Sequence, residues 1–88
     1  MRAISLFYGI IIRMYWNELA KHKTPHFHAS YGEYSAEFAF DGEVLSGKLP
    51  NKQTTLVKAW AALHEDDLKA NWQLALDGEE LYRIEPLR

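Results

Sequence analysis

Hydrophobic residues follow two different patterns in the two halves of the chain. From residue 4 to residue 49, β-branched and aromatic residues are frequent and alternate with polar ones, which is typical of β-strands. From residue 51 to residue 77, apolar residues recur at intervals of three and four, which is typical of an amphipathic helix. Strands followed by a helix predict an α+β domain.

Four strands are expected in the first half. The first runs from Ile4 to Trp16, a stretch with few charges, and Gly9 is interpreted as a bulge within it. The polar residues from Asn17 to Pro25 are interpreted as an exposed loop. The remaining strands are expected at His26–Tyr31, Tyr34–Phe40 and Glu43–Leu49.

Two turns predict how the last three strands pair. Asp41-Gly42 is the strongest hairpin signal, because a type I′ turn needs positive φ at both central positions, and Gly32-Glu33 is interpreted as a second two-residue turn. Phe38 then lies opposite both Phe27 and Leu45. Both hairpins place the same set of residues on one core face, and a slip of one residue would turn that set to solvent. The set is Phe27, Ala29, Tyr31, Tyr34, Ala36, Phe38 and Leu45.

The second half predicts one long helix of about six or seven turns. Asn51 is the expected N-cap and Gly78 the expected C-terminal cap. Residues Leu81 to Leu87 are compatible with a short edge strand. The predicted fold is therefore an antiparallel four-stranded β-meander packed against one long amphipathic C-terminal helix, in a single domain of residues 1–88.

Composition and charge narrow the function classes. The 88 residues are 48% hydrophobic, so the chain is expected to fold, and the net charge of −2 argues against a general nucleic-acid binder. Residues 1–28 nevertheless carry four basic side chains and one acidic one, so this end could attract an anion. No cysteine is present, and no apolar run approaches the ~20 residues of a membrane span. We therefore expect a cytoplasmic protein with no membrane partner.

Chemistry is expected on the face of the sheet opposite the core. Two histidines, His26 and His28, are spaced by two residues, so they point to the same side of their strand. The predicted register places Glu37 directly across from His28. If the first strand lies beside the second, Arg13 joins the same polar face.

This group of residues allows two kinds of site. His28 oriented by Glu37, with Arg13 holding a developing anion, would suit general acid–base catalysis on RNA or a nucleotide, with His26 as a second imidazole. Alternatively, His26 and His28 would bind a divalent metal with His22 or Glu37 as a third ligand. His64, which lies on the apolar stripe of the helix, is interpreted as a buried histidine with a backbone or tyrosine partner.

The chain resembles a small bacterial family, the domain of unknown function numbered 4160. The resemblance is carried by FYGI with the following IRMY at residues 7–15, by PHFHA at 25–29, by YGE at 31–33, and by Trp60, His64 and Asn71-Trp72 in the helix. Such domains are often encoded beside a second small family, numbered 2442, in arrangements like toxin–antitoxin pairs. The resemblance therefore implies a small protein partner encoded by a neighbouring gene.

The loop before the two histidines departs from the family pattern. Many members have an Asp-His-x-Pro-Pro run there, whereas this chain has Lys21-His22-Lys23-Thr24-Pro25 after a few additional residues. A role that needs the acidic residue would require a substitute such as Glu18 from the longer loop Asn17–Thr24. Three hypotheses follow: a partner-binding component of a toxin–antitoxin-like pair, an enzyme acting on RNA or a nucleotide, and a metal-binding module.

Overall fold

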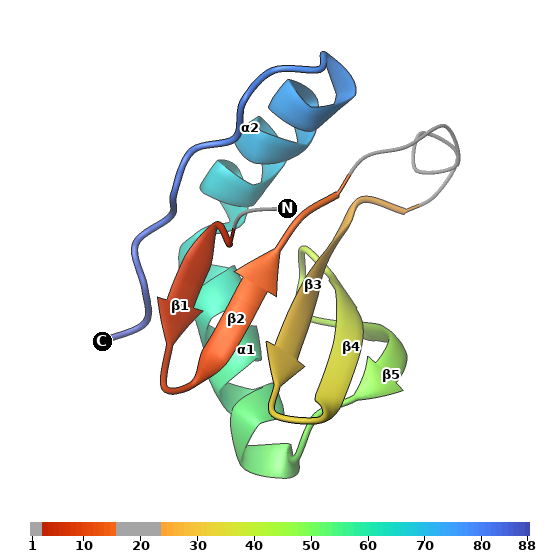
Figure 1. Ribbon diagram of the computed structural model, residues 1–88, viewed down its shortest axis with the longest axis vertical. Coiled ribbons are helices and arrows are strands. Elements are labelled where there is room, and N and C mark those ends of the chain that lie inside the picture. Colours follow the sequence, from red (N-terminus) through yellow and green to blue (C-terminus); the bar gives the residue numbers. More distant parts are fainter. Residues whose placement is uncertain (1–2, 16–23) are drawn as a thin grey trace.

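The computed structural model describes residues 3–15 and 24–88, which form a single sheet with two helices (Figure 1). The strands are antiparallel and follow chain order across the sheet. The predicted α+β class is confirmed, whereas the predicted counts of four strands and one helix are wrong. Within the described residues the elements are β1 (Ser5–Phe7), β2 (Ile10–Arg13), β3 (His26–Tyr31), β4 (Tyr34–Ala39), β5 (Val44–Lys48), α1 (Asn51–Leu63) and α2 (Glu65–Leu76).

The expected first strand is a hairpin, β1–β2, and Gly9 is part of its turn instead of a bulge. Tyr8 and Gly9 both have positive φ, 49° and 79°, and Phe7 pairs with Ile10. These features are those of a type I′ turn. A straight strand would place Phe7 and Ile10 on opposite faces, but the turn brings both into the core, where they are 6% and 0% exposed.

The β3–β4 hairpin has the predicted register. Tyr31 pairs with Tyr34 across a two-residue turn, and Phe27 pairs with Phe38. Gly32 has a φ of 57°, a conformation that glycine adopts without the strain of a side chain. The rings of Phe27 and Phe38 stack with centroids 5.5 Å apart and are fully buried. The register therefore turns Phe27 and Phe38 inward and the two histidines to the opposite face. Tyr34 is 44% exposed, so its predicted place in the core is wrong.

The β4–β5 connection differs from the predicted two-residue turn. The amide of Ala39 donates to the carbonyl of Glu43 at 2.8 Å, so three residues form the loop. Gly42 has positive φ but Asp41 does not, and the Asp41 carboxylate accepts a hydrogen bond from the amide of Glu43 at 2.9 Å. A three-residue loop with glycine in the left-handed conformation is the next most common hairpin connection.

The longer loop is accompanied by a register shift between Glu37 and Phe38. Phe38 consequently pairs with Val44, so the predicted pairing of Phe38 with Leu45 is wrong. Leu45 is 41% exposed and does not join the core. Beyond the shift, Gly47 lies opposite Ala36 as predicted.

The predicted long helix is divided at His64. The backbone of His64 has φ −122° and ψ 26°, outside the helical range, although its amide still reaches the carbonyls of Trp60 and Ala61. Three consecutive acidic residues, 65–67, form the first turn of α2, where carboxylates favour a helix N-terminus. The apolar period continues through the break, which is why spacing alone predicts one helix.

The two predicted helix caps have opposite outcomes. Pro50 is the N-cap of α1 and Asn51 is its first helical residue, so the prediction of Asn51 as the N-cap is wrong. At the end of α2, Gly78 has a φ of 72° and its amide donates to Ala75, while the amide of Glu79 donates to Leu74. This pair of bonds is a Schellman motif, and the prediction of Gly78 as the cap is confirmed.

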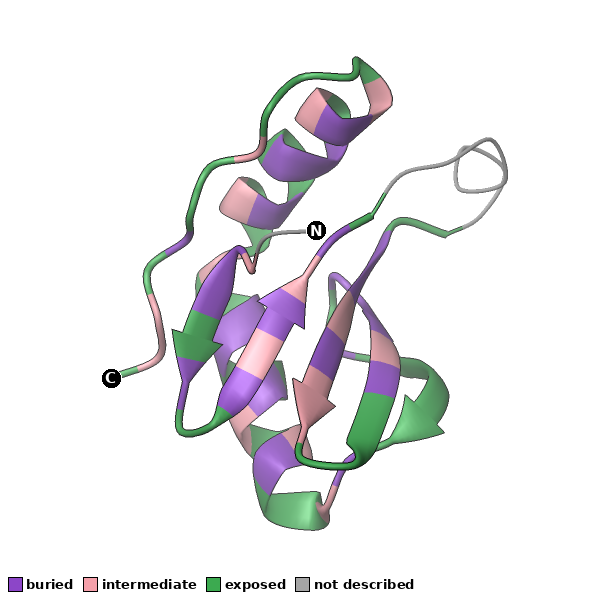
Figure 2. Ribbon diagram, in the orientation of Figure 1, coloured by how far each residue is buried: buried purple, intermediate pink, exposed green. Residues whose placement is uncertain are grey.

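Helix α1 covers the inner face of the sheet (Figures 1 and 2). The Trp60 ring lies 5.5 Å from the rings of both Phe7 and Phe27, centroid to centroid. Trp60 is fully buried, as expected for a core residue. Within residues 3–15 and 24–88, no helix lies over the opposite face except where Trp72 of α2 contacts His26 at its end. The polar residues considered below lie on this face.

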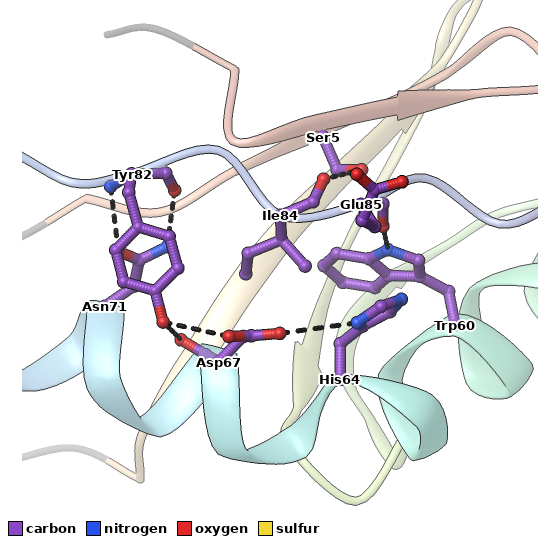
Figure 3. A network of polar contacts seen from close by, with 8 residues as sticks. All are labelled: Ser5, Trp60, His64, Asp67, Asn71, Tyr82, Ile84 and Glu85. Atoms are coloured by element: carbon purple, nitrogen blue, oxygen red, sulfur yellow. Dashed lines mark hydrogen bonds and ion pairs between the residues drawn. The ribbon is translucent and has the colours of Figure 1, made fainter.

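The C-terminal segment, residues 79–88, forms no strand, so the expected edge strand is wrong. It nevertheless lies alongside β1 (Figures 1 and 3). The Ile84 amide donates to the carbonyl of Ile4 at 2.7 Å, and the Ser5 hydroxyl donates to the carbonyl of Ile84 at 3.0 Å. Asn71 exchanges two hydrogen bonds with the backbone of Tyr82. The segment is not a strand because these two hydrogen bonds to residues 4 and 5 do not form the repeated backbone pairing of neighbouring strands.

Neither helix in the described part of the chain combines the length and the apolar character that crossing a bilayer requires.

Candidate functional site

A row of polar side chains crosses four strands on the outer face of the sheet. Arg13 on β2 pairs with His28 on β3, His28 pairs with Glu37 on β4, and Glu37 pairs with Ser46 on β5. Directly paired residues have Cβ atoms about 4.5–5.5 Å apart. The inference that Arg13, His28 and Glu37 share one face is thus confirmed by the register, and Ser46 is an addition that the sequence did not indicate.

Glu37 also reaches His26, its diagonal neighbour. The Oε1 atom of Glu37 lies 3.3 Å from Nε2 of His26, and Oε2 accepts a hydrogen bond of 2.9 Å from the hydroxyl of Ser46. The carboxylate is therefore held from two sides. The sequence placed Glu37 directly across from His28 and named it as a possible third metal ligand, but strand pairing alone did not show its diagonal contact with His26.

His26 is buried although it lies on the polar face. It is 6% exposed, and its ring lies 5.5 Å from Trp72 of α2 and 5.3 Å from His28, centroid to centroid. Its Nδ1 atom is 2.9 Å from the backbone carbonyl of Thr24. Helix α2 therefore supplies an aromatic wall at this end of β3, which sequence spacing could not indicate because Trp72 is distant in the chain.

His28 is half-buried and lies between His26 and Tyr15. The edge of one ring faces the other in the pair formed by Tyr15 and His28, with centroids 4.6 Å apart. Tyr15 is itself exposed, so this side of the cluster reaches the surface. A substrate or ligand that approaches the outer face would meet His28 and Glu37 before His26.

Three side chains are placed so that they could hold one cation. His26, His28 and Glu37, hereafter the His–His–Glu cluster, each offer one ligand atom, and these atoms all lie within 4.8 Å of one another. Glu37 thus provides the third position that the sequence left open between Glu37 and His22. His22, like Glu18 and most of the loop before Pro25, lies outside the described residues.

The remaining histidine, His64, differs from its expected role. It is half-buried, and its Nδ1 atom lies 3.4 Å from Oδ2 of Asp67 (Figure 3). The other oxygen of Asp67 accepts a hydrogen bond of 3.0 Å from the hydroxyl of Tyr82. His64 therefore belongs to the attachment of the C-terminal segment and lies outside the His–His–Glu cluster.

A cleft of about 670 Å³ lies beneath the C-terminal segment. It shares no lining residue with the His–His–Glu cluster, and buried apolar side chains such as Ile4, Met14 and Ala75 form part of its wall. Sequence patterns do not indicate this cleft, because it forms where residues 78–83 approach residues 3–4, Met14 and Ala75, which are distant in the chain.

Comparison with known proteins gives one family. The family described as "Domain of unknown function (DUF4160)" matches residues 9–73, which include the turn at Gly9, the His–His–Glu cluster, α1 and most of α2. No curated protein and no solved structure gives a significant match. Because the match covers well over half of its length, the chain belongs to the DUF4160 family.

Proposed function

We propose that the protein is one component of a toxin–antitoxin-like pair and binds a small protein partner encoded by a neighbouring gene. Membership of the DUF4160 family supports this function through the gene arrangements that the resemblance implies. One observation on the molecule itself carries the proposal: the last strand of the sheet, β5, is exposed along its whole length.

Strand β5 lies at one end of the sheet and pairs only with β4 among the described strands. An edge strand presents backbone N–H and C=O groups to which a strand of another protein can bind. Val44 and Leu45 add exposed apolar side chains on the same strand. We therefore propose the β5 edge as the surface that receives the partner.

Binding between this chain and the product of the adjacent gene tests the proposal. Leu45→Lys places a charge on the β5 edge, and we expect it to weaken binding by roughly tenfold or more, which corresponds to about 1.4 kcal/mol. Leu63→Lys is the matched control, because Leu63 is also exposed, at 71%, but ends α1. If the two proteins do not associate, or if Leu45→Lys binds as tightly as Leu63→Lys, the proposal is wrong.

The polar row favours a second candidate function, action on RNA or a nucleotide. Arg13 suits phosphate binding because its guanidinium group is planar and permanently charged. His28 beside it could transfer a proton, with Glu37 orienting the ring. These are the parts needed to cleave a phosphodiester bond by acid–base catalysis.

Growth inhibition on expression, and hydrolysis of RNA by the purified chain, test this candidate. His28→Ala should abolish both effects, whereas His64→Ala should leave them in place, because His64 lies outside the His–His–Glu cluster. The candidate is lost if the wild-type chain is inert in both assays or if His28→Ala is as active as His64→Ala.

A further inference from the structure

We propose that His26, His28 and Glu37 form a binding site for one divalent transition-metal ion of the zinc class. This inference goes beyond partner binding, since it concerns the outer face of β3 and β4 and needs no second protein.

The distances within the His–His–Glu cluster suit such an ion. Two ligand atoms at the ~2.0–2.1 Å of zinc bonds, arranged tetrahedrally, lie roughly 3.4 Å apart. The Nε2 atom of His26 and Oε1 of Glu37 are 3.3 Å apart, and the ligand atom of His28 completes a group within 4.8 Å. Binding one ion would require the longest of these separations, at most 4.8 Å, to shorten.

The orientation of His26 gives an independent argument. A backbone carbonyl only accepts hydrogen bonds, so the contact of Nδ1 with the carbonyl of Thr24 at 2.9 Å places a proton on Nδ1. In the neutral ring, Nε2 then carries a lone pair, and this lone pair faces the Glu37 carboxylate. A positive charge between the nitrogen and the carboxylate stabilises this arrangement. A second ring proton would serve this pair alone, whereas a metal ion would bind His28 as well.

The surroundings of the ligands are also those of a metal site. Histidine ligands usually donate their second N–H to a carbonyl or carboxylate, and carboxylate ligands are themselves hydrogen-bonded. His26 meets the first condition through Thr24, and Glu37 meets the second through the hydroxyl of Ser46 at 2.9 Å. The ring of Trp72 provides an apolar wall beside His26.

The ligand types select the class of metal. Imidazole nitrogen favours zinc and its transition-metal neighbours, whereas Ca²⁺ and Mg²⁺ prefer sets made of oxygen atoms. Two histidines and one glutamate leave a fourth position of a tetrahedral ion for water or another molecule, as in zinc sites with three protein ligands. His28 and Glu37 are only partly buried, so this fourth position faces the surface.

Metal titration of the chain without an affinity tag tests the site. We expect Zn²⁺ to bind with a stoichiometry of one by calorimetry, and Co²⁺ to give the visible absorption of a tetrahedral ion. Glu37→Gln, which keeps the shape of the side chain, and His28→Ala should each lower the affinity at least tenfold. Ser46→Ala, which removes only the support of Glu37, should give a smaller loss, of about tenfold.

His64→Ala is the matched control, because it removes a histidine paired with a carboxylate at 3.4 Å outside the cluster. It should bind Zn²⁺ as the wild type does. A thermal unfolding curve without metal shows whether each variant folds. If His28→Ala fails to fold, the histidine resonances of the wild type decide instead: Zn²⁺ should shift those of His26 and His28 but not those of His64.

The proposal is overturned if the wild type binds no stoichiometric Zn²⁺. It is also overturned if Glu37→Gln and His28→Ala both bind as tightly as the wild type, or if Zn²⁺ perturbs His64 in place of the cluster. The titration uses the chain alone, so its outcome does not depend on whether the proposed protein partner exists.

Discussion

The two edges of the sheet differ in whether another segment of the chain covers them. At the β1 edge, the C-terminal segment contacts the strand through Ile84, which is 4% exposed, and through the hydroxyl of Ser5. At the β5 edge, every residue of the strand is exposed, and β4 is the only described strand that pairs with it. A sheet of this size can therefore cover one edge with its own chain and leave the other edge open (Figure 2).

The difference predicts that changes at the covered edge affect the stability of the fold and changes at the open edge affect binding to other molecules. The covering segment buries apolar area and satisfies backbone groups, so changes there should affect unfolding. The exposed side chains of the open edge, such as Val44 and Leu45, bury little apolar area and therefore contribute little to the stability of the fold. Changes to exposed side chains on β5 should therefore leave the free energy of unfolding nearly unchanged while altering interactions with other molecules.

Truncation of one apolar side chain at each edge is expected to give the largest contrast. Ile84→Ala removes a buried side chain at the covered edge and should lower the free energy of unfolding by about 2–4 kcal/mol. Leu45→Ala removes an exposed one at the open edge and should change it by less than about 0.5 kcal/mol. Urea denaturation of both variants measures the contrast, and equal losses would contradict the distinction between the edges.

A glycine substitution should show that the open edge is still closely packed against its inner neighbour. Gly47 on β5 has a φ of 71°, and a Cβ atom there would lie 2.3 Å from the carbonyl oxygen of Ser35. Gly47→Ala therefore adds a clash with the backbone to left-handed strain, and we expect a loss of about 2–3 kcal/mol.

Gly32→Ala is the control for that prediction. Gly32 has a similar φ of 57°, but a Cβ atom there would meet nothing within 4 Å. Only the backbone strain remains, so a loss of about 1 kcal/mol is expected. If thermal unfolding shows the two variants to be equally destabilised, the close approach of β5 to β4 does not contribute to the cost of the Gly47 substitution.

A pH titration should give the smallest effect and report on the covered edge alone. Partial burial, and after it the hydrogen bond to Asp67 and the charge of that carboxylate, raise the pKa of Tyr82 above its ordinary value. The folded state therefore holds the phenolic proton more tightly than the unfolded state. This contribution to stability is complete below the unfolded pKa and is lost as pH rises through the folded pKa.

Urea denaturation between about pH 8 and pH 11 measures this dependence. The loss of stability at the alkaline end should be smaller in Tyr82→Phe than in the wild type. Leu45→Ala, at the open edge, should retain the dependence of the wild type. An identical pH profile for Tyr82→Phe and the wild type would show that the Tyr82–Asp67 contact does not couple to folding.

The pairing of β3 with β4 at the centre of the sheet could be predicted, because side chains alternate along a strand and a two-residue turn sets the register. The pairing of Phe27 with Phe38 and of His28 with Glu37 followed from Gly32-Glu33. The same rules failed at Tyr8-Gly9, because a tyrosine in the left-handed conformation is uncommon and the apolar run continues on both sides of it. They failed at His64 because the helical period is unbroken there.

The candidate site was predicted as far as the strands position it. The shared face of Arg13, His28 and Glu37 is a consequence of alternation, which the sequence displays directly. The reach of Glu37 to His26 and the Trp72 wall depend on side-chain orientation and on the packing of α2. Contacts of this kind join distant or diagonal positions, so no periodic pattern records them.

The attachment of Ile84 to β1 has a consequence for the folding pathway. The hydrogen bond between Ser5 and Ile84 links residues 79 positions apart, whereas the His–His–Glu cluster spans a single hairpin. Long loops close at a higher entropic cost and contribute late to folding. The cluster can therefore assemble early, while the outer edge of β1 stays available for mispairing until the last long-range contact forms. Chains that have not yet formed this contact should consequently aggregate through β1, the edge that the native state conceals.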